Sequence, residues 1–127
     1  MLQSSQPFAS FAVPDIGAAR HFYGEQLGLD VRDAPEQGII ELHFNGGPPV
    51  IVYPKPDHRP AVFTILNFPV ADVDAAVDEL AGKGIGMERF EMDGMEPDDK
   101  GIYRGEGPAI AWFKDPAGNI LSVLETS

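Results

Sequence analysis

The first half of the chain combines short apolar stretches with one segment of helical periodicity. Apolar residues between positions 8 and 13 predict a strand, and Asp15 stands where a helix N-cap is expected. Apolar residues then recur at helical spacing until Gly28, a residue typical of helix ends. Three short strands are predicted next, at residues 29–34, 38–45 and 50–53, and the turns between them are rich in Pro and Gly. The pattern predicts the order βαβββ.

The second half predicts the same order of elements. After a stretch broken by prolines, residues 62–70 predict a strand, and Asp72 is placed to cap a helix that ends at Lys83-Gly84. Three further strands are predicted at 87–92, 108–114 and 120–125. Between them, residues 93–107 form a long loop. A loop of this length either covers a binding cleft or is an ordinary flexible insertion.

A short motif occurs twice, each time where a strand leads into a helix. Its first copy is Phe11, Val13, Asp15, Ile16, Ala18 and Ala19, and its second is Phe68, Val70, Asp72, Val73, Ala75 and Ala76. Such a repeat predicts two copies of one unit packed together, with the working site in the cleft between them. Units of about 60 residues are marginally stable alone. We therefore expect one α+β domain over residues 1–127, with module 1 at 7–55, a linker at 54–61 and module 2 at 62–126.

Several ordered motifs resemble those of the vicinal oxygen chelate superfamily, which includes glyoxalase I, bleomycin-resistance proteins and extradiol dioxygenases. They are Val13-Pro14-Asp15-Ile16, His21-Phe22-Tyr23, Leu27-Gly28-Leu29, the stretch from Val70 to Val77, and Asp115-Pro116-Ala117-Gly118-Asn119. The resemblance implies paired βαβββ modules whose curved mixed sheets enclose a cleft, as in the glyoxalase/bleomycin-resistance fold. It also implies that a second subunit often completes the cleft, so we expect a homodimer.

The resemblance further implies where a metal would be held. Enzymes of this superfamily generally bind a divalent metal through His and Glu side chains, and the matching positions here are Phe8, Ile65, Ser122 and a residue near Val52. Apolar side chains have no lone pairs, and a neutral serine hydroxyl is a poor ligand for a divalent metal. We therefore expect no metal and no other cofactor.

The cleft lining follows from the alternation of side chains along each strand, once Phe8 and Ile65 are taken to face inward. Trp112 either stacks on a planar or cationic ligand or is a core tryptophan, and both interpretations remain open. An aromatic wall with a few polar groups is typical of a small-molecule pocket. The predicted ligand-binding residues are Phe8, Ser10, Glu41, His43, Phe63, Ile65, Asn67, Trp112 and Ser122.

Glu41 and His43 form the acid/base pair that the strand pattern best supports. Residues two apart on a strand point the same way, so the carboxylate would lie beside the imidazole, as proton transfer requires. The alternative is a polar, solvated face of an antiparallel sheet. We favour this alternative for the chemistry and keep both residues as ligand contacts and as weak catalytic candidates.

Charge and composition exclude several classes of function. The net charge is −11, from 20 acidic and 9 basic residues, which opposes binding to nucleic acid or to an anionic membrane. The absence of cysteine excludes disulfides, thiolate nucleophiles and cysteine-based zinc sites. The N-terminus shows no leader pattern, and no apolar run approaches the ~20 residues of a membrane span. We expect a cytoplasmic protein.

The expected function is binding of a small planar or cationic molecule in a metal-free cleft. The alternative is a lyase or isomerase of a small carbonyl compound that uses Glu41 and His43 or a non-standard metal site. A third possibility is a ligand-sensing or accessory module without chemistry of its own.

Overall fold

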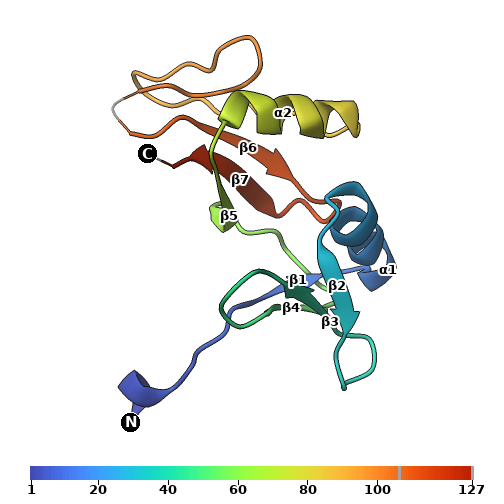
Figure 1. Ribbon diagram of the computed structural model, residues 1–127. Helices are drawn as coiled ribbons and strands as arrows, with labels where there is room; N and C mark the ends of the chain where they lie inside the picture. The colour runs from blue at the N-terminus through green and yellow to red at the C-terminus, as the bar shows by residue number, and fades with distance from the viewer. Residues whose placement is uncertain (106, 127) are drawn as a thin grey trace. The chain divides into compact units, whose positions relative to one another are not determined.

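The computed structural model describes residues 1–105 and 107–126, which form two compact units, Met1–Arg59 and the part from Pro60 onward (Figure 1). The first unit begins with a 3₁₀ turn at Leu2–Ser4, which precedes β1 (Ser10–Val13). A helical segment follows, made of α1 (Ile16–Arg20) and a π-helical stretch at His21–Gln26. The unit is completed by β2 (Asp30–Asp33), β3 (Ile40–His43) and β4 (Val50–Pro54).

The second unit contains β5 (Thr64–Val70), α2 (Val73–Gly82), β6 (Ile110–Lys114) and β7 (Ile120–Glu125). Both units have mixed sheets. The first sheet has the order β1-β4-β3-β2, with β1 and β4 parallel and the other pairs antiparallel. The second has the order β5-β7-β6, with β5 and β7 parallel and β6 and β7 antiparallel. The predicted α+β class is confirmed.

The two helical segments start alike. The Asp15 carboxylate accepts a hydrogen bond from the Ala18 N–H, and the Asp72 carboxylate accepts one from the Ala75 N–H, both at 3.1 Å. These are the N-caps that the sequence predicts. The first segment differs from a regular helix, because the Leu27 N–H bonds to the Phe22 carbonyl five residues back.

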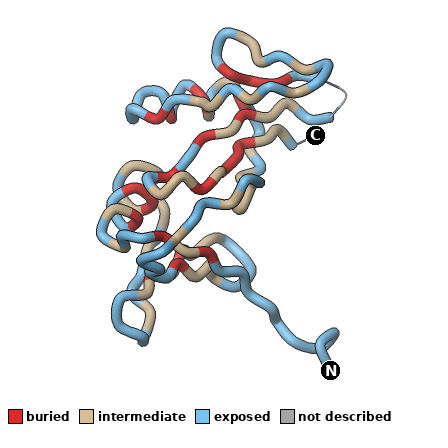
Figure 2. The backbone as a smooth tube through the Cα atoms, turned by 180° about the vertical axis from the view of Figure 1, so that it is seen from behind, coloured by how far each residue is buried: buried red, intermediate tan, exposed pale blue. Residues whose placement is uncertain are grey.

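The helical segments cover one face of each sheet, and Figure 2 shows that each unit contains buried residues. In the first unit α1 packs on β4, and Tyr23 of the π-helical stretch is fully buried against Phe11 of β1. In the second unit α2 packs on β6 and β7. Burying these apolar side chains supplies the main favourable free energy of folding. The buried strand residues are Phe11, Val13, Ile40, Leu42, Val52, Ala111, Phe113, Leu121 and Val123.

One predicted strand is wrong. Residues 87–92 do not form a strand, although Glu88 makes an isolated bridge to Trp112 and Met92 makes one to Met95. The same edge of β6 also pairs with Tyr103, which bridges Ile110. Because two separate segments share this short edge, neither extends into a ladder.

Over the described residues the longest helix, α2, has 10 residues. None of the helices there has the length and apolar character needed to cross a bilayer.

Candidate functional site

The sheet of the first unit has an open face, which points away from its helical segment. The strand register places one residue of each strand in a single row on this face, since their neighbours along the strands are the buried core residues. From β1 to β2 the row is Ser10, Ile51, Glu41 and Arg32. His43 lies on the same face, two residues beyond Glu41.

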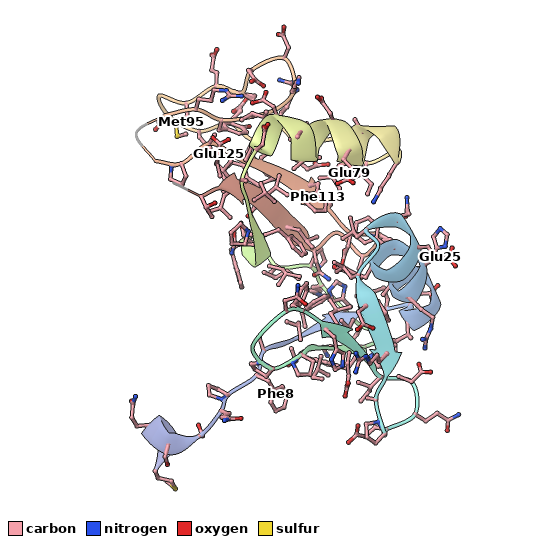
Figure 3. All side chains as sticks on the ribbon, in the orientation of Figure 1. Phe8, Glu25, Glu79, Met95, Phe113 and Glu125 are labelled. Atoms are coloured by element: carbon pink, nitrogen blue, oxygen red, sulfur yellow. The ribbon has the colours of Figure 1, made fainter. Side chains whose placement is uncertain are left out.

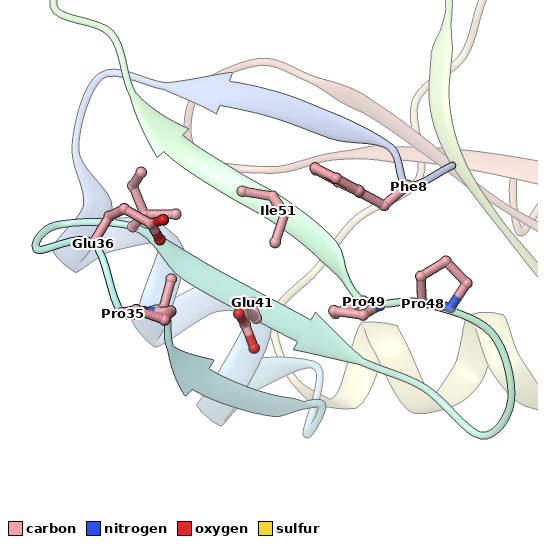
Figure 4. Close-up of a pocket in the computed structure, with 9 residues that line it drawn as sticks. Phe8, Pro35, Glu36, Glu41, Pro48, Pro49 and Ile51 are labelled. Atoms are coloured by element: carbon pink, nitrogen blue, oxygen red, sulfur yellow. The ribbon is translucent and has the colours of Figure 1, made fainter. Parts of the chain in front are cut away.

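A pocket of about 480 Å³ lies on this open face (Figure 4). The β2–β3 turn, with Pro35 and Glu36, forms one end, and the β3–β4 turn forms the other with Pro48 and Pro49. Proline-rich turns give the pocket stiff walls, because each pyrrolidine ring fixes its φ angle. The residues that line it are Phe8, Ala34, Pro35, Glu36, Ile39, Glu41, Pro48, Pro49 and Ile51.

Phe8 is the aromatic residue of this lining, and its side chain is exposed. It precedes β1, extends away from the ribbon and is 65% exposed (Figure 3). In the pocket its ring points toward Ile51 (Figure 4). An aromatic side chain left in water beside another apolar group offers apolar surface that a ligand can bury.

Two carboxylates face the pocket in different states. Glu41 is engaged, because its Oε1 lies 2.7 Å from Nε2 of His43 and both side chains are about three-quarters buried. The Glu36 carboxylate is exposed and has no hydrogen-bond or ion-pair partner among the described residues. Glu36 is therefore the pocket carboxylate that is available to a ligand without displacing an internal partner.

A second ion pair lies beside Glu41 and His43. Arg32 of β2 makes a two-pronged contact with Asp30, at 3.2 Å and 2.8 Å. This hydrogen bond is the main reason that the pKa of Asp30 is lowered and that the pKa of Arg32 is raised. The register sets Asp30 opposite His43 and Arg32 opposite Glu41, so an acidic side chain faces a basic one in each pair across the two strands.

The open face of the second unit brings together three of the predicted residues. Asn67 of β5, Ser122 of β7 and Trp112 of β6 lie in one row across the sheet. The Ser122 hydroxyl donates to Oδ1 of Asn67 at 2.5 Å. Ser122 is fully buried although it lies on the open face.

The indole of Trp112 reaches across this sheet. The Trp112 Nε1–H donates to the hydroxyl oxygen of Thr64 at 3.0 Å. Trp112 belongs to β6 and Thr64 to β5, and β7 runs between these strands, so the indole must cross β7. Trp112 is itself half-buried, held edge-on by Phe90 and Tyr103 with ring centroids 5.9 Å and 5.1 Å away. It is both a packed side chain and a partly open aromatic surface.

Thr64 is a residue that sequence reasoning missed. Strict alternation predicts that Phe63, Ile65 and Asn67 share a face, but the register of β5 shifts between Thr64 and Leu66. This bulge brings Thr64 to the face of Trp112. Ile65 is the half-buried residue inserted at the bulge, and Phe63 precedes the strand with 66% exposure. No local signal in the sequence marks the bulge.

The segment between α2 and β6 is anchored rather than loose. Arg104 contacts Asp74 of α2 at 2.8 Å and Asp98 at 3.3 Å, and Lys100 contacts Asp78 at 3.1 Å. The hydrogen bond from Arg104 lowers the pKa of Asp74. Burial alone would raise the pKa of Asp98, but backbone N–H donors and Arg104 outweigh it, and the pKa is lowered.

Seven of the nine predicted ligand-binding residues thus fall into two groups, one in each unit. Phe8, Ser10, Glu41 and His43 belong to the open face of the first unit, with the turn residue Glu36 as an addition that the sequence did not suggest. Asn67, Ser122 and Trp112 form the row of the second unit.

The sequence profile of the Glyoxalase/Bleomycin resistance protein/Dioxygenase superfamily matches residues 6–123. The chain belongs to this superfamily. A search of curated protein sequences finds no match.

Solved structures of the superfamily have the same fold. TnmS3, an antibiotic binding protein from Streptomyces sp. CB03234, is 21% identical with a TM-score of 0.71, and the alignment covers 98% of each chain. The fosfomycin resistance protein FosX from Listeria monocytogenes is 11% identical with a TM-score of 0.69, over 98% of this chain and 94% of that one. A glyoxalase family protein from Enterococcus faecalis is 22% identical with a TM-score of 0.65, over 98% and 100%.

The positions that hold a metal in the superfamily's enzymes do not fit one here. The internal repeat predicts one of these positions near Val52. Val52 is buried in the core beneath the helical segment, and Ile51 lies on the open face instead. Phe8 and Ile65 offer no lone pairs, and the Ser122 hydroxyl is committed to Asn67. Among the described residues, no three His, Asp or Glu side chains gather where they could share an ion.

Proposed function

We propose that this protein binds a small organic molecule, planar or cationic, without a metal, in the pocket on the open face of the first unit. The observation that carries the proposal is the pocket itself, which combines apolar walls with the Glu36 carboxylate, a group that has no partner among the described residues. Small-molecule sites are mostly apolar with a few polar groups that fix orientation. The antibiotic-binding role of TnmS3, a protein of the same fold, supports this class of function.

The charge of the ligand follows from the pocket. Glu36 would pair with a ligand ammonium group, while Phe8 and the prolines would bury its apolar body. An anionic ligand would meet two carboxylates at short range and a net charge of −11 at long range. The pocket is therefore proposed to favour cations over anions.

Isothermal titration calorimetry with tryptamine and tryptophol tests this proposal. The two probes share the indole ring and differ in an ammonium group against a hydroxyl, and bleomycin serves as a larger cation. We expect tryptamine to bind saturably, with an affinity that falls in Glu36→Gln and in Phe8→Ala. Tryptophol should bind more weakly, and its affinity should be the same in Glu36→Gln as in the wild type. No saturable heat with any of these aromatic cations at moderate salt would overturn the proposed function.

A second candidate function rests on the contact between Glu41 and His43 at 2.7 Å. A carboxylate that holds an imidazole in place is a common arrangement for general acid–base catalysis. A lyase or isomerase acting on a small carbonyl compound would use this pair. Loss of turnover in His43→Ala with an unchanged fold would favour this function over simple binding.

We also propose that the chain forms a homodimer. Large apolar side chains left in water support it, notably Val62 at 93% and Phe63 at 66% exposure. Size-exclusion chromatography with light scattering gives the mass directly. A monomer at all concentrations up to the millimolar range would contradict this proposal.

A further inference from the structure

The side-chain amide of Asn67 is hydrogen-bonded through its oxygen and not, among the described residues, through its nitrogen. Its Oδ1 accepts the hydrogen bond from Ser122. Its Nδ2 has no partner among the described residues, and the side chain is exposed on the open face of the second unit. A primary amide nitrogen carries two N–H donors. Because the oxygen already accepts from a buried hydroxyl, the groups of the amide without a partner among the described residues are its two N–H donors.

The indole of Trp112 lies on the same face and is fixed there. It crosses β7 to reach Thr64, and Phe90 and Tyr103 pack against it edge-on. A ring held by a hydrogen bond and two aromatic contacts loses little further freedom when a ligand binds, which lowers the entropic cost of binding. The half-buried indole is therefore a pre-organised aromatic surface, and it lies in the same row as Asn67.

We propose that this face of the second unit binds a planar aromatic group that carries a carbonyl oxygen on its ring edge. The ring packs on Trp112, and the carbonyl oxygen accepts a hydrogen bond from Nδ2 of Asn67. The proposal rests on the small-molecule function proposed above and makes Asn67 its specificity-determining residue.

The N–H donors of the Asn67 amide determine which ligands are favoured. A ligand that carries only an N–H at this edge would place donor against donor, so both partners would lose hydrogen bonds to water. A ligand without any polar edge would leave the amide donors covered and unpaired. A neutral carbonyl compound satisfies the donors, so a site of this kind rejects analogues that lack the acceptor.

The experiment compares coumarin with naphthalene, two fused bicyclic rings that differ in the carbonyl-bearing edge. Two-dimensional ¹H–¹⁵N NMR follows the Asn67 side-chain amide and the Nε1–H of Trp112, which gives one indole signal because the chain has a single tryptophan. We expect both probes to shift the Trp112 signal. Only coumarin is expected to move the Asn67 amide protons downfield.

A substitution separates the acceptor contact from the stacking contact. In Asn67→Asp the carboxylate still accepts from Ser122, but the donors are lost. We expect the affinity for coumarin to fall about fivefold, as for one hydrogen bond, with the affinity for naphthalene changed by less than about twofold. Asn45→Asp, the same change at an exposed position of the first unit, is the matched control and should leave both affinities unchanged.

Three outcomes would overturn the inference. Coumarin that shifts Trp112 without moving the Asn67 amide, or an Asn67→Asp variant that weakens both probes alike, shows that Asn67 does not select an acceptor. Probes that leave Trp112 unmoved show that this face does not take planar rings. None of these results contradicts the proposed function, which is tested by the tryptamine titration of the first unit.

Discussion

The hydroxyl of Tyr103 bonds to both backbone groups of Phe90. It accepts from the Phe90 N–H at 2.5 Å and donates to the Phe90 carbonyl at 2.9 Å. Tyr103 is fully buried, and its ring packs against Trp112 as the ring of Phe90 does. The Tyr103 hydroxyl thus satisfies the backbone N–H and carbonyl of Phe90, which lies in a segment that forms no strand.

We expect Tyr103→Phe to lower the free energy of unfolding by about 1–3 kcal/mol. The substitution keeps the ring but leaves two backbone groups of Phe90 without their partner. Urea denaturation followed by far-UV circular dichroism measures the loss. Tyr53→Phe removes a hydroxyl from an exposed tyrosine and should change stability by less than about 0.5 kcal/mol. Equal effects of the two substitutions would contradict the bridging role.

The turn between β6 and β7 depends on the buried carboxylate of Asp115. Its Oδ1 accepts from the N–H groups of Ala117 and Asn119, and its Oδ2 accepts from the Asn119 amide at 3.0 Å. Asp115→Ala should lower the free energy of unfolding by roughly 2–4 kcal/mol, because buried donors lose their acceptor. Asp93→Ala, at an exposed position, is the control in the same thermal denaturation series. A stable Asp115→Ala variant would show that the turn forms without the carboxylate.

Gly101 occupies a position that no other residue fits without strain. Its φ is +89°, and a Cβ added there would lie 2.7 Å from the Cβ of Met87. Gly101→Ala should destabilise the protein by more than the ~1 kcal/mol expected from the left-handed conformation alone. Gly94→Ala isolates the conformational term, since φ is +76° there and nothing lies within 4 Å. A comparison of their midpoints in urea measures the steric part, and identical midpoints would rule it out.

Acid should weaken the anchoring of the segment between α2 and β6. The pKa values of Asp74 and Asp98 are lowered in the folded state, so their contribution to stability is complete above the ordinary aspartate pKa of about 4. It is lost as the pH falls through their folded-state pKa values. Urea midpoints between pH 6 and pH 3 should therefore fall less steeply in Arg104→Met than in the wild type. Arg59→Met removes an exposed charge from outside this network and should keep the wild-type slope.

The elements that the sequence predicts well are those with local causes. The two helix starts depend on Asp15 and Asp72 and on the apolar spacing that follows each, and both are found where predicted. The strands of the first unit are also found between the turns that the sequence predicts. Each of these features involves residues close in the chain.

The features that sequence reasoning misses have distant causes. The bulge at Thr64 depends on pairing with β7, about half the chain away, so alternation along β5 gives no sign of it. The failure of residues 87–92 to form a strand follows from competition with Tyr103 for one edge. Likewise, Glu36 faces the pocket because two turns fold toward the same part of the sheet, which no motif encodes.

The fixed setting of the single tryptophan gives the protein a built-in optical reporter of its second unit. Emission from Trp112 changes when β6 and its aromatic neighbours come apart, whereas far-UV circular dichroism averages over both units. Superimposable melting curves from the two signals would mean that the units unfold as one cooperative body. Separated curves would mean that the two units unfold one after the other. A single unlabelled sample would then show which unit unfolds first.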